Sequence, residues 1–149
     1  MEANITTKIE SFLKRMDGDK LPMMTLEEFF GNEYLEEDFI APNQWGFGRP
    51  SLAEIHEQLR KVEVRPDVAW VRVVLHGDTD VGDRDGEAVY EIMGDAIAIC
   101  TIAEASEIEQ AANCEFLCSD GVDGIFDDTW HTEIPGIPEG YKVRVLWWD

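Results

Sequence analysis

Four side chains that could bind a metal ion or move a proton lie close together along the chain: Asp127, Asp128, His131 and Glu133. Carboxylates and imidazole are the groups that hold divalent metals and carry out acid–base catalysis. A chain this rich in acids also produces such runs by composition alone. The pattern therefore predicts a solvated segment, with no catalytic residue, no metal and no cofactor. A metal-dependent enzyme of unknown substrate remains an alternative hypothesis.

Two further patterns are incomplete as metal sites. A calcium loop needs an oxygen ligand at its fifth position and Glu at its twelfth. Counted from Asp78, these positions hold Gly82 and Val89. Cys114 and Cys118 have no second pair of ligands nearby, whereas structural zinc sites combine two such pairs. The sequence also lacks a phosphate-binding loop, a nucleophile elbow and a metalloprotease helix.

Charge is the strongest signal in the sequence. Asp and Glu number 32 against 12 Lys and Arg, which gives a net charge of −20. Such a charge attracts basic partners and repels nucleic acid and anionic membranes. No Lys or Arg occurs between Asp85 and Tyr141, and a second acidic run without bases spans Glu27 to Asp38. We expect a basic protein partner, no direct nucleic-acid binding and no membrane association. The oligomeric state stays open.

Aromatic residues interleave with both acidic runs. Aromatic anchors supply contact area at interfaces, while charges steer and select the partner. This combination predicts a partner-binding face made of Tyr34, Glu36, Glu37, Asp38, Asp120, Asp123, Phe126, Asp127, Asp128 and Trp130. The alternative is that the rings fill the core beneath long loops.

The compartment follows from the cysteines and the N-terminus. Three cysteines form no disulfide framework, and the first residues lack the basic and apolar segments of a signal peptide. The longest apolar run is far shorter than the ~20 residues that span a bilayer. These features predict a cytoplasmic protein.

Periodicity predicts the elements that must position these side chains. Helices are expected at residues 4–16, from the capping box at Thr25 to near Gly31-Asn32, from the capping box at Ser51 to about Val62, and at residues 104–113. Strands are expected at 68–75, 89–93, 96–102, 116–118 and 141–148, of which 68–75 and 96–102 are apolar enough for the sheet interior and the last is half exposed. Residues 76–87 are expected to form a polar loop, and residues 119–140 a long loop or weak hairpin.

The order of these elements predicts one α+β domain over residues 1–149. Helices near the N-terminus would pack on a mixed, mostly antiparallel sheet of about four to five strands. The strand–helix–strand piece at 96–118 could supply one parallel crossover.

Three segments carry a resemblance to known proteins: Phe29-Phe30-Gly31-Asn32, Arg65-Pro66-Asp67-Val68 and Val145-Leu146-Trp147-Trp148-Asp149. With them the chain resembles a group of small acidic bacterial proteins, and in size, charge and α+β pattern it is similar to toxin-immunity proteins. The resemblance implies a stoichiometric inhibitor that neutralises a basic toxin, plausibly a nuclease, in the cytosol. A nucleic-acid mimic that inhibits a DNA-binding protein is the second hypothesis.

Overall fold

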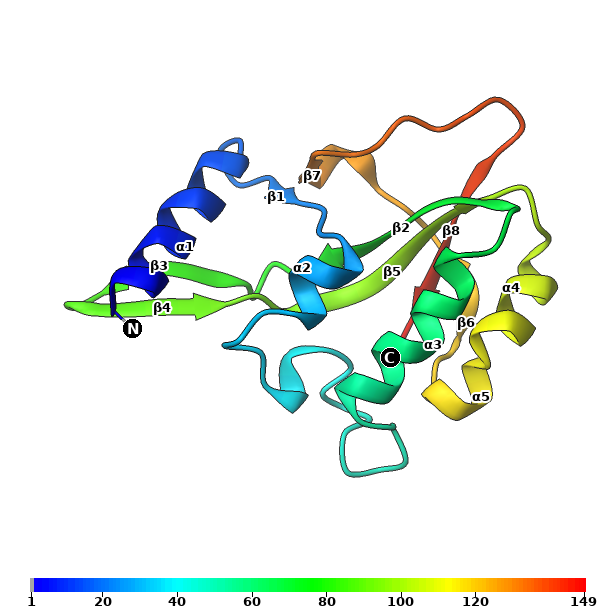
Figure 1. The fold of residues 1–149 in the computed structure, drawn as a ribbon, viewed down its shortest axis with the longest axis horizontal. Helices are drawn as coiled ribbons and strands as arrows, with labels where there is room; N and C mark the ends of the chain where they lie inside the picture. The colour runs from blue at the N-terminus through cyan, green and yellow to red at the C-terminus, as the bar shows by residue number, and fades with distance from the viewer. Residues whose placement is uncertain (1) are drawn as a thin grey trace.

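The computed structural model describes residues 2–149, and Figure 1 shows helices arranged beside a twisted sheet. In chain order the elements are α1 (Glu2–Arg15), β1 (Leu21–Pro22), α2 (Leu26–Phe30), the 3-10 helix η1 (Glu37–Phe39), α3 (Leu52–Glu63), β2 (Val68–Leu75), β3 (Asp80–Arg84), β4 (Glu87–Glu91), β5 (Gly94–Thr101), α4 (Ala105–Ala112), α5 (Cys114–Leu117), β6 (Gly121–Gly124), the 3-10 helix η2 (Asp128–Trp130), β7 (His131–Thr132) and β8 (Lys142–Trp147).

The main sheet has four strands in the order β2-β5-β8-β6, and each neighbouring pair is antiparallel. β5 and β6 therefore run in the same direction with β8 inserted between them. A short parallel pair, β1 with β7, lies apart from this sheet (Figure 1). The predicted α+β class, with helices on a mostly antiparallel sheet of about four to five strands, is confirmed.

Local sequence signals set the helix starts as predicted. The side chains of Thr25 and Ser51 each accept a hydrogen bond from the backbone N–H of the third residue of the following helix. The carboxylates of Glu28 and Glu54 accept one in turn from the backbone N–H of the capping residue. Each box satisfies two backbone N–H groups that a helix start leaves without partners.

One face of the sheet is covered by helices. The buried residues there include Leu26 and Phe29 of α2, Ile55 and Leu59 of α3, and Ile108 of α4. They pack with alternate residues of the central strands, which point to that face because strand side chains alternate. This main core anchors the sheet from one side only.

The opposite face carries a smaller apolar cluster over unusually small side chains. Ala96, Ala98 and Cys100 project from β5 to this side. In the strand register, Ala96 stands between Val74 of β2 and Trp147 of β8. A short side chain between two larger ones leaves a depression in the sheet surface.

The predicted polar loop at 76–87 is wrong. Residues Asp80–Arg84 and Glu87–Glu91 pair as a hairpin, β3 with β4. Asp85 and Gly86 occupy its two-residue turn with φ of 55° and 89°, and turns of this kind match the twist of the flanking strands. Figure 1 shows α1 lying along this hairpin, at the end of the molecule away from α4 and α5.

Two other predictions about elements are corrected. β2 was expected in the interior but forms an edge of the main sheet, where Met24 pairs with Val73 through an isolated bridge. Residues 116–118 were expected as a strand but belong to α5 and its end, because left-handed Asn113 ends α4 and caps the next turn. β8 is half exposed as expected, with Val145 and Leu146 buried and Lys142 exposed, and it lies between β5 and β6.

No helix among the described residues 2–149 is both long and apolar enough to cross a membrane.

Candidate functional site

The depression on the outer face of the sheet opens into a pocket with aromatic walls. It has a volume of about 540 Å³. We call it the aromatic pocket, and its lining residues are Asp19, Leu21, Val74, Leu75, His76, Gly77, Asp95, Ala96, Gly124, Ile125, Phe126, Asp127, Trp130, His131, Val145, Trp147 and Trp148. Val74, Ala96 and Val145 of three neighbouring strands form its floor.

The segment after β6 forms one wall of the aromatic pocket. Phe126 stacks on His131 with ring centroids 6.0 Å apart. Trp130 remains 60% exposed beside them. Exposed rings at the rim of a pocket are available to a binding partner, since nothing within the chain buries them.

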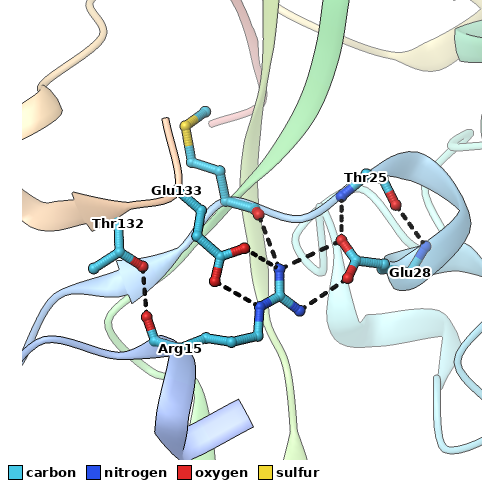
Figure 2. Close-up of polar contacts among 6 residues, drawn as sticks. Arg15, Thr25, Glu28, Thr132 and Glu133 are labelled. Carbon is cyan, nitrogen blue, oxygen red and sulfur yellow. Dashed lines mark hydrogen bonds and ion pairs between the residues drawn. The ribbon is translucent and has the colours of Figure 1, made fainter. Parts of the chain in front are cut away.

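A cluster around Arg15 ties this wall to the N-terminal helices. Figure 2 shows the guanidinium of Arg15 between the carboxylates of Glu133 and Glu28, with Arg15 Nε 2.8 Å from Glu133 Oε2 and Nη1 2.9 Å from Glu28 Oε2. The backbone carbonyl of Arg15 also accepts a hydrogen bond from the Thr132 hydroxyl. Farther along the same segment, Trp70 Nε1 donates to the carbonyl of Gly136 at 2.9 Å. The wall is therefore fixed at two places.

The charges inside the aromatic pocket are negative. Hydrogen bonds from Thr129 lower the pKa of Asp127, so this carboxylate stays ionised at neutral pH. Burial lowers the pKa of His131 despite nearby Asp127 and Asp95, so the ring adds no positive charge at neutral pH. The carboxylates of Asp19 and Asp95 accept no hydrogen bond and pair with no Lys or Arg within residues 2–149, and the Asp95 charge acts on His131.

Of the predicted partner-binding residues, Phe126, Asp127 and Trp130 line the aromatic pocket, and Asp128 is exposed in η2 beside it. Asp120 and Asp123 do not line it. Asp123 Oδ1 instead accepts a hydrogen bond from Trp147 Nε1 at 2.8 Å, which holds that ring against the pocket. Asp120 accepts one from the Asp149 amide.

The other predicted group, Tyr34, Glu36, Glu37 and Asp38, lies elsewhere and does not line the aromatic pocket. In this group the Tyr34 ring and the Glu37 carboxylate each have a cation from the same chain. Lys8 lies over the Tyr34 ring, and buried Arg49 pairs with Glu37, which also caps α3 at Leu52 N. Glu36 and Asp38 are exposed. The aromatic pocket therefore takes in residues of the second predicted group and none of this one.

Sequence reasoning missed Asp19, Asp95, Ala96 and Trp147 as pocket residues. A signal for Trp147 existed, because it alternates with Val145 and Val143 on one face of the last strand. Asp19 and Asp95 gave none, since they reach the pocket only through the packing of β1 and the register of β5.

The candidate metal cluster does not assemble. Glu133 is engaged by Arg15, and Asp127 accepts from Thr129 N at 2.9 Å. Within residues 2–149 no three or more His, Cys, Asp or Glu side chains are grouped as a metal site. The structure thus does not join Asp127, Asp128, His131 and Glu133 as ligands of one ion.

Comparison with known proteins gave one match. The model of a family described as the uncharacterized protein YfbO family matches residues 3–146. No curated protein and no solved structure matches the chain.

Proposed function

The chain belongs to the YfbO family, which is uncharacterized, and from its structure we propose that it is an inhibitory protein-binding module that neutralises a basic partner. In this proposal the aromatic pocket receives a cationic side chain of that partner, in the way an immunity protein covers a toxin. The proposed place of action is the cytoplasm.

One observation carries the proposal: some carboxylates of the base-free acidic runs find a cation in the folded chain, and those of the aromatic pocket do not. Glu28 and Glu133 pair with Arg15, and Glu37 pairs with Arg49. No Lys or Arg is among the described residues that line the pocket. Like charges held together without a counter-charge are unfavourable until a cation arrives.

The rings of the pocket favour the same kind of ligand. A cation over the face of an aromatic ring gains about 0.5 to 2 kcal/mol, more as water is removed. Trp130, Trp147 and Phe126 are close to the carboxylates that would attract such a group. Affinity would then come mainly from the rings, and the speed of association from the charge.

The test compares variants of the full chain as bait for basic proteins from a lysate of the source organism, at low salt. Wild type should retain a basic protein. Trp130→Ala, Asp127→Asn and Ala96→Leu, which fills the pocket floor, should each reduce its retention at least about fivefold, since each removes part of the contact. The retained protein is then identified, and the wild-type chain should inhibit its activity at a one-to-one ratio.

Glu57→Gln is the matched control, because it removes one exposed carboxylate from α3, outside the pocket. It should retain the partner as wild type does. If all four variants capture the same protein equally, the pocket is not the binding surface. If duplex DNA releases the protein while the pocket variants still hold it, nucleic-acid mimicry by another acidic surface replaces the proposal.

A further inference from the structure

A second hollow adjoins the aromatic pocket. It has a volume of about 370 Å³, and its lining residues are Ala41, Pro42, Asn43, His76, Asp78, Met93, Gly94, Asp95, Trp148 and Asp149. His76, Asp95 and Trp148 line both hollows. The two hollows therefore border each other along these residues near the start of β5, and we call the pair the groove.

The second hollow is also acidic, but it differs in its walls. Asp78 and Asp149 contribute carboxylates, and Asp95 is shared with the aromatic pocket. No Lys or Arg belongs to its lining within the described chain. The shared His76 accepts a hydrogen bond at Nδ1 from the Asp78 amide at 2.9 Å, and the same Nδ1 lies 3.4 Å from Asp78 Oδ2. Besides the His76 imidazole, Trp148 contributes an aromatic ring to this lining, and that ring is buried.

From this pairing we infer that the groove binds two basic side chains of one extended segment of the partner, with arginine in the aromatic pocket. A guanidinium is planar and weakly hydrated, and it stacks on rings while it pairs with carboxylates. The aromatic pocket offers both kinds of contact. The second hollow offers chiefly carboxylates, which suit either Lys or Arg as a compact charge.

The spacing of the two side chains follows from strand geometry. In an extended segment, residues two apart point to the same side and lie about 7 Å from each other. The two hollows adjoin and share Asp95, so side chains of nearby residues in one extended segment can enter both. The partner motif is thus Arg-X-Arg or Arg-X-Lys, in which X points away from the groove. This inference rests on the proposed function, since it names the ligand of the same pocket.

The experiment uses the full chain and short synthetic peptides in calorimetric titrations at low salt. The probes are the uncharged-ended peptide Gly-Gly-Arg-Ser-Arg-Gly-Gly, the versions with Gln in place of one or the other arginine, and a version with Lys at the first basic position. The two-arginine peptide should bind at least about tenfold tighter than either single-arginine peptide. Lys at the first position should weaken binding, because stacking on the rings is reduced.

Two variants separate the hollows. Trp130→Ala should weaken the two-arginine peptide about tenfold, as expected for the loss of a partly desolvated cation–π contact. Asp78→Asn should remove the advantage of the second arginine and leave a single-arginine peptide unaffected. Glu57→Gln, with the same change in charge on α3, should alter neither.

Affinity that follows only peptide charge, with Asp78→Asn and Glu57→Gln equal in effect, would overturn the inference. If the peptides fail this pattern while pocket variants still lose the captured protein, the two-site groove is wrong and the proposed function stands. If the peptides bind as expected but no basic protein is ever captured, the groove stands as a cation site and the inhibitory function fails.

Discussion

Arg15 joins three segments that are far apart in the chain: α1, the start of α2 and the residues that follow η2. Its partner Glu133 adopts a positive φ of 58°. A residue with a side chain pays about 1 to 2 kcal/mol for this left-handed conformation. The ion pair with Arg15 offsets that strain and keeps the pocket wall in place.

Arg15→Gln should therefore lower the free energy of unfolding by about 1.5 kcal/mol, the scale of two partly screened charge-assisted pairs. Urea unfolding at neutral pH measures the change. Arg84→Gln is the comparison, because Arg84 pairs with Asp80 on the exposed hairpin. This variant should lower the free energy of unfolding by about 0.5 kcal/mol or less. Equal losses would show that the Arg15 cluster acts as an ordinary surface ion pair.

Glu28 makes the same cluster sensitive to acid. Burial acts to raise its pKa, but hydrogen bonds from Thr25 and the charge of Arg15 outweigh burial and leave the pKa below its ordinary 4.5. Its contribution to stability is thus complete above the ordinary value and is lost as the pH falls through the folded value. Unfolding free energies from pH 7 to pH 3 should drop less in Glu28→Gln than in wild type. Parallel curves would contradict this role.

At the scale of elements, β6 depends on a close approach to β8. A Cβ on Gly124 would lie 2.9 Å from Val145 Cγ1 and 3.0 Å from the Val145 carbonyl oxygen. This is nearer than a methyl group tolerates, and the opposing atoms include backbone. The edge strand can therefore pair here only because residue 124 has no side chain.

Gly124→Ala should destabilise the protein by about 1 to 3 kcal/mol, the usual effect of forcing a methyl into a packed contact. Thermal unfolding with the Gly136→Ala variant as control checks this. Gly136 has no atom within 4 Å of the position its Cβ would take, so its variant should match wild type. An unchanged melting temperature for Gly124→Ala would mean that β6 shifts away without loss.

The elements show which predictions a sequence can support. Capping boxes at Thr25 and Ser51 were predicted correctly because all their atoms lie within four residues. The β3–β4 hairpin was not predicted, although Asp85-Gly86 is a strong turn signal, because a polar, acidic segment rich in turn residues also indicates a loop. β2 was placed inside the sheet because its apolar pattern reports covered faces and says nothing about neighbouring strands.

The same limit applies to the candidate site. Phe126, Asp127 and Trp130 were predicted from a local alternation of rings and acids, and they do line the aromatic pocket. Ala96 and Asp95 could not be predicted as pocket residues. An alanine forms a pocket floor only when the strand register sets it between two larger residues, here Val74 and Trp147. Cations also pair across long sequence separations, so a base-free run in the sequence does not predict a base-free surface.

At the scale of the whole molecule, the net charge of −20 should oppose folding at neutral pH. Added salt shortens the range of this repulsion from about 10 Å at 0.1 M to about 3 Å at 1 M. The melting temperature should therefore rise as NaCl increases from low to moderate concentration at pH 7. Scanning fluorimetry over a salt series measures it.

Measurement near the isoelectric point, about 4.3, provides the control for the salt series. The net charge there approaches zero, so the gain from salt should shrink or vanish. A melting temperature that falls with salt at pH 7 would show that ion pairs such as Arg15 with Glu28 and Glu133 outweigh the general repulsion.

β8 follows every other strand in the chain, yet it lies between β5 and β6. A ribosome delivers β2, β5 and β6 first, and the edge of β5 opposite β2 has no partner strand until residues 142–147 emerge, nor has β6. In that interval the nascent chain holds a gap in its sheet, with unpaired backbone groups on both sides of it. Arrival of β8 closes both edges and brings Trp147 to the pocket in the same step. Biosynthesis thus couples completion of the sheet to completion of the candidate binding surface, and a partially synthesised chain has neither.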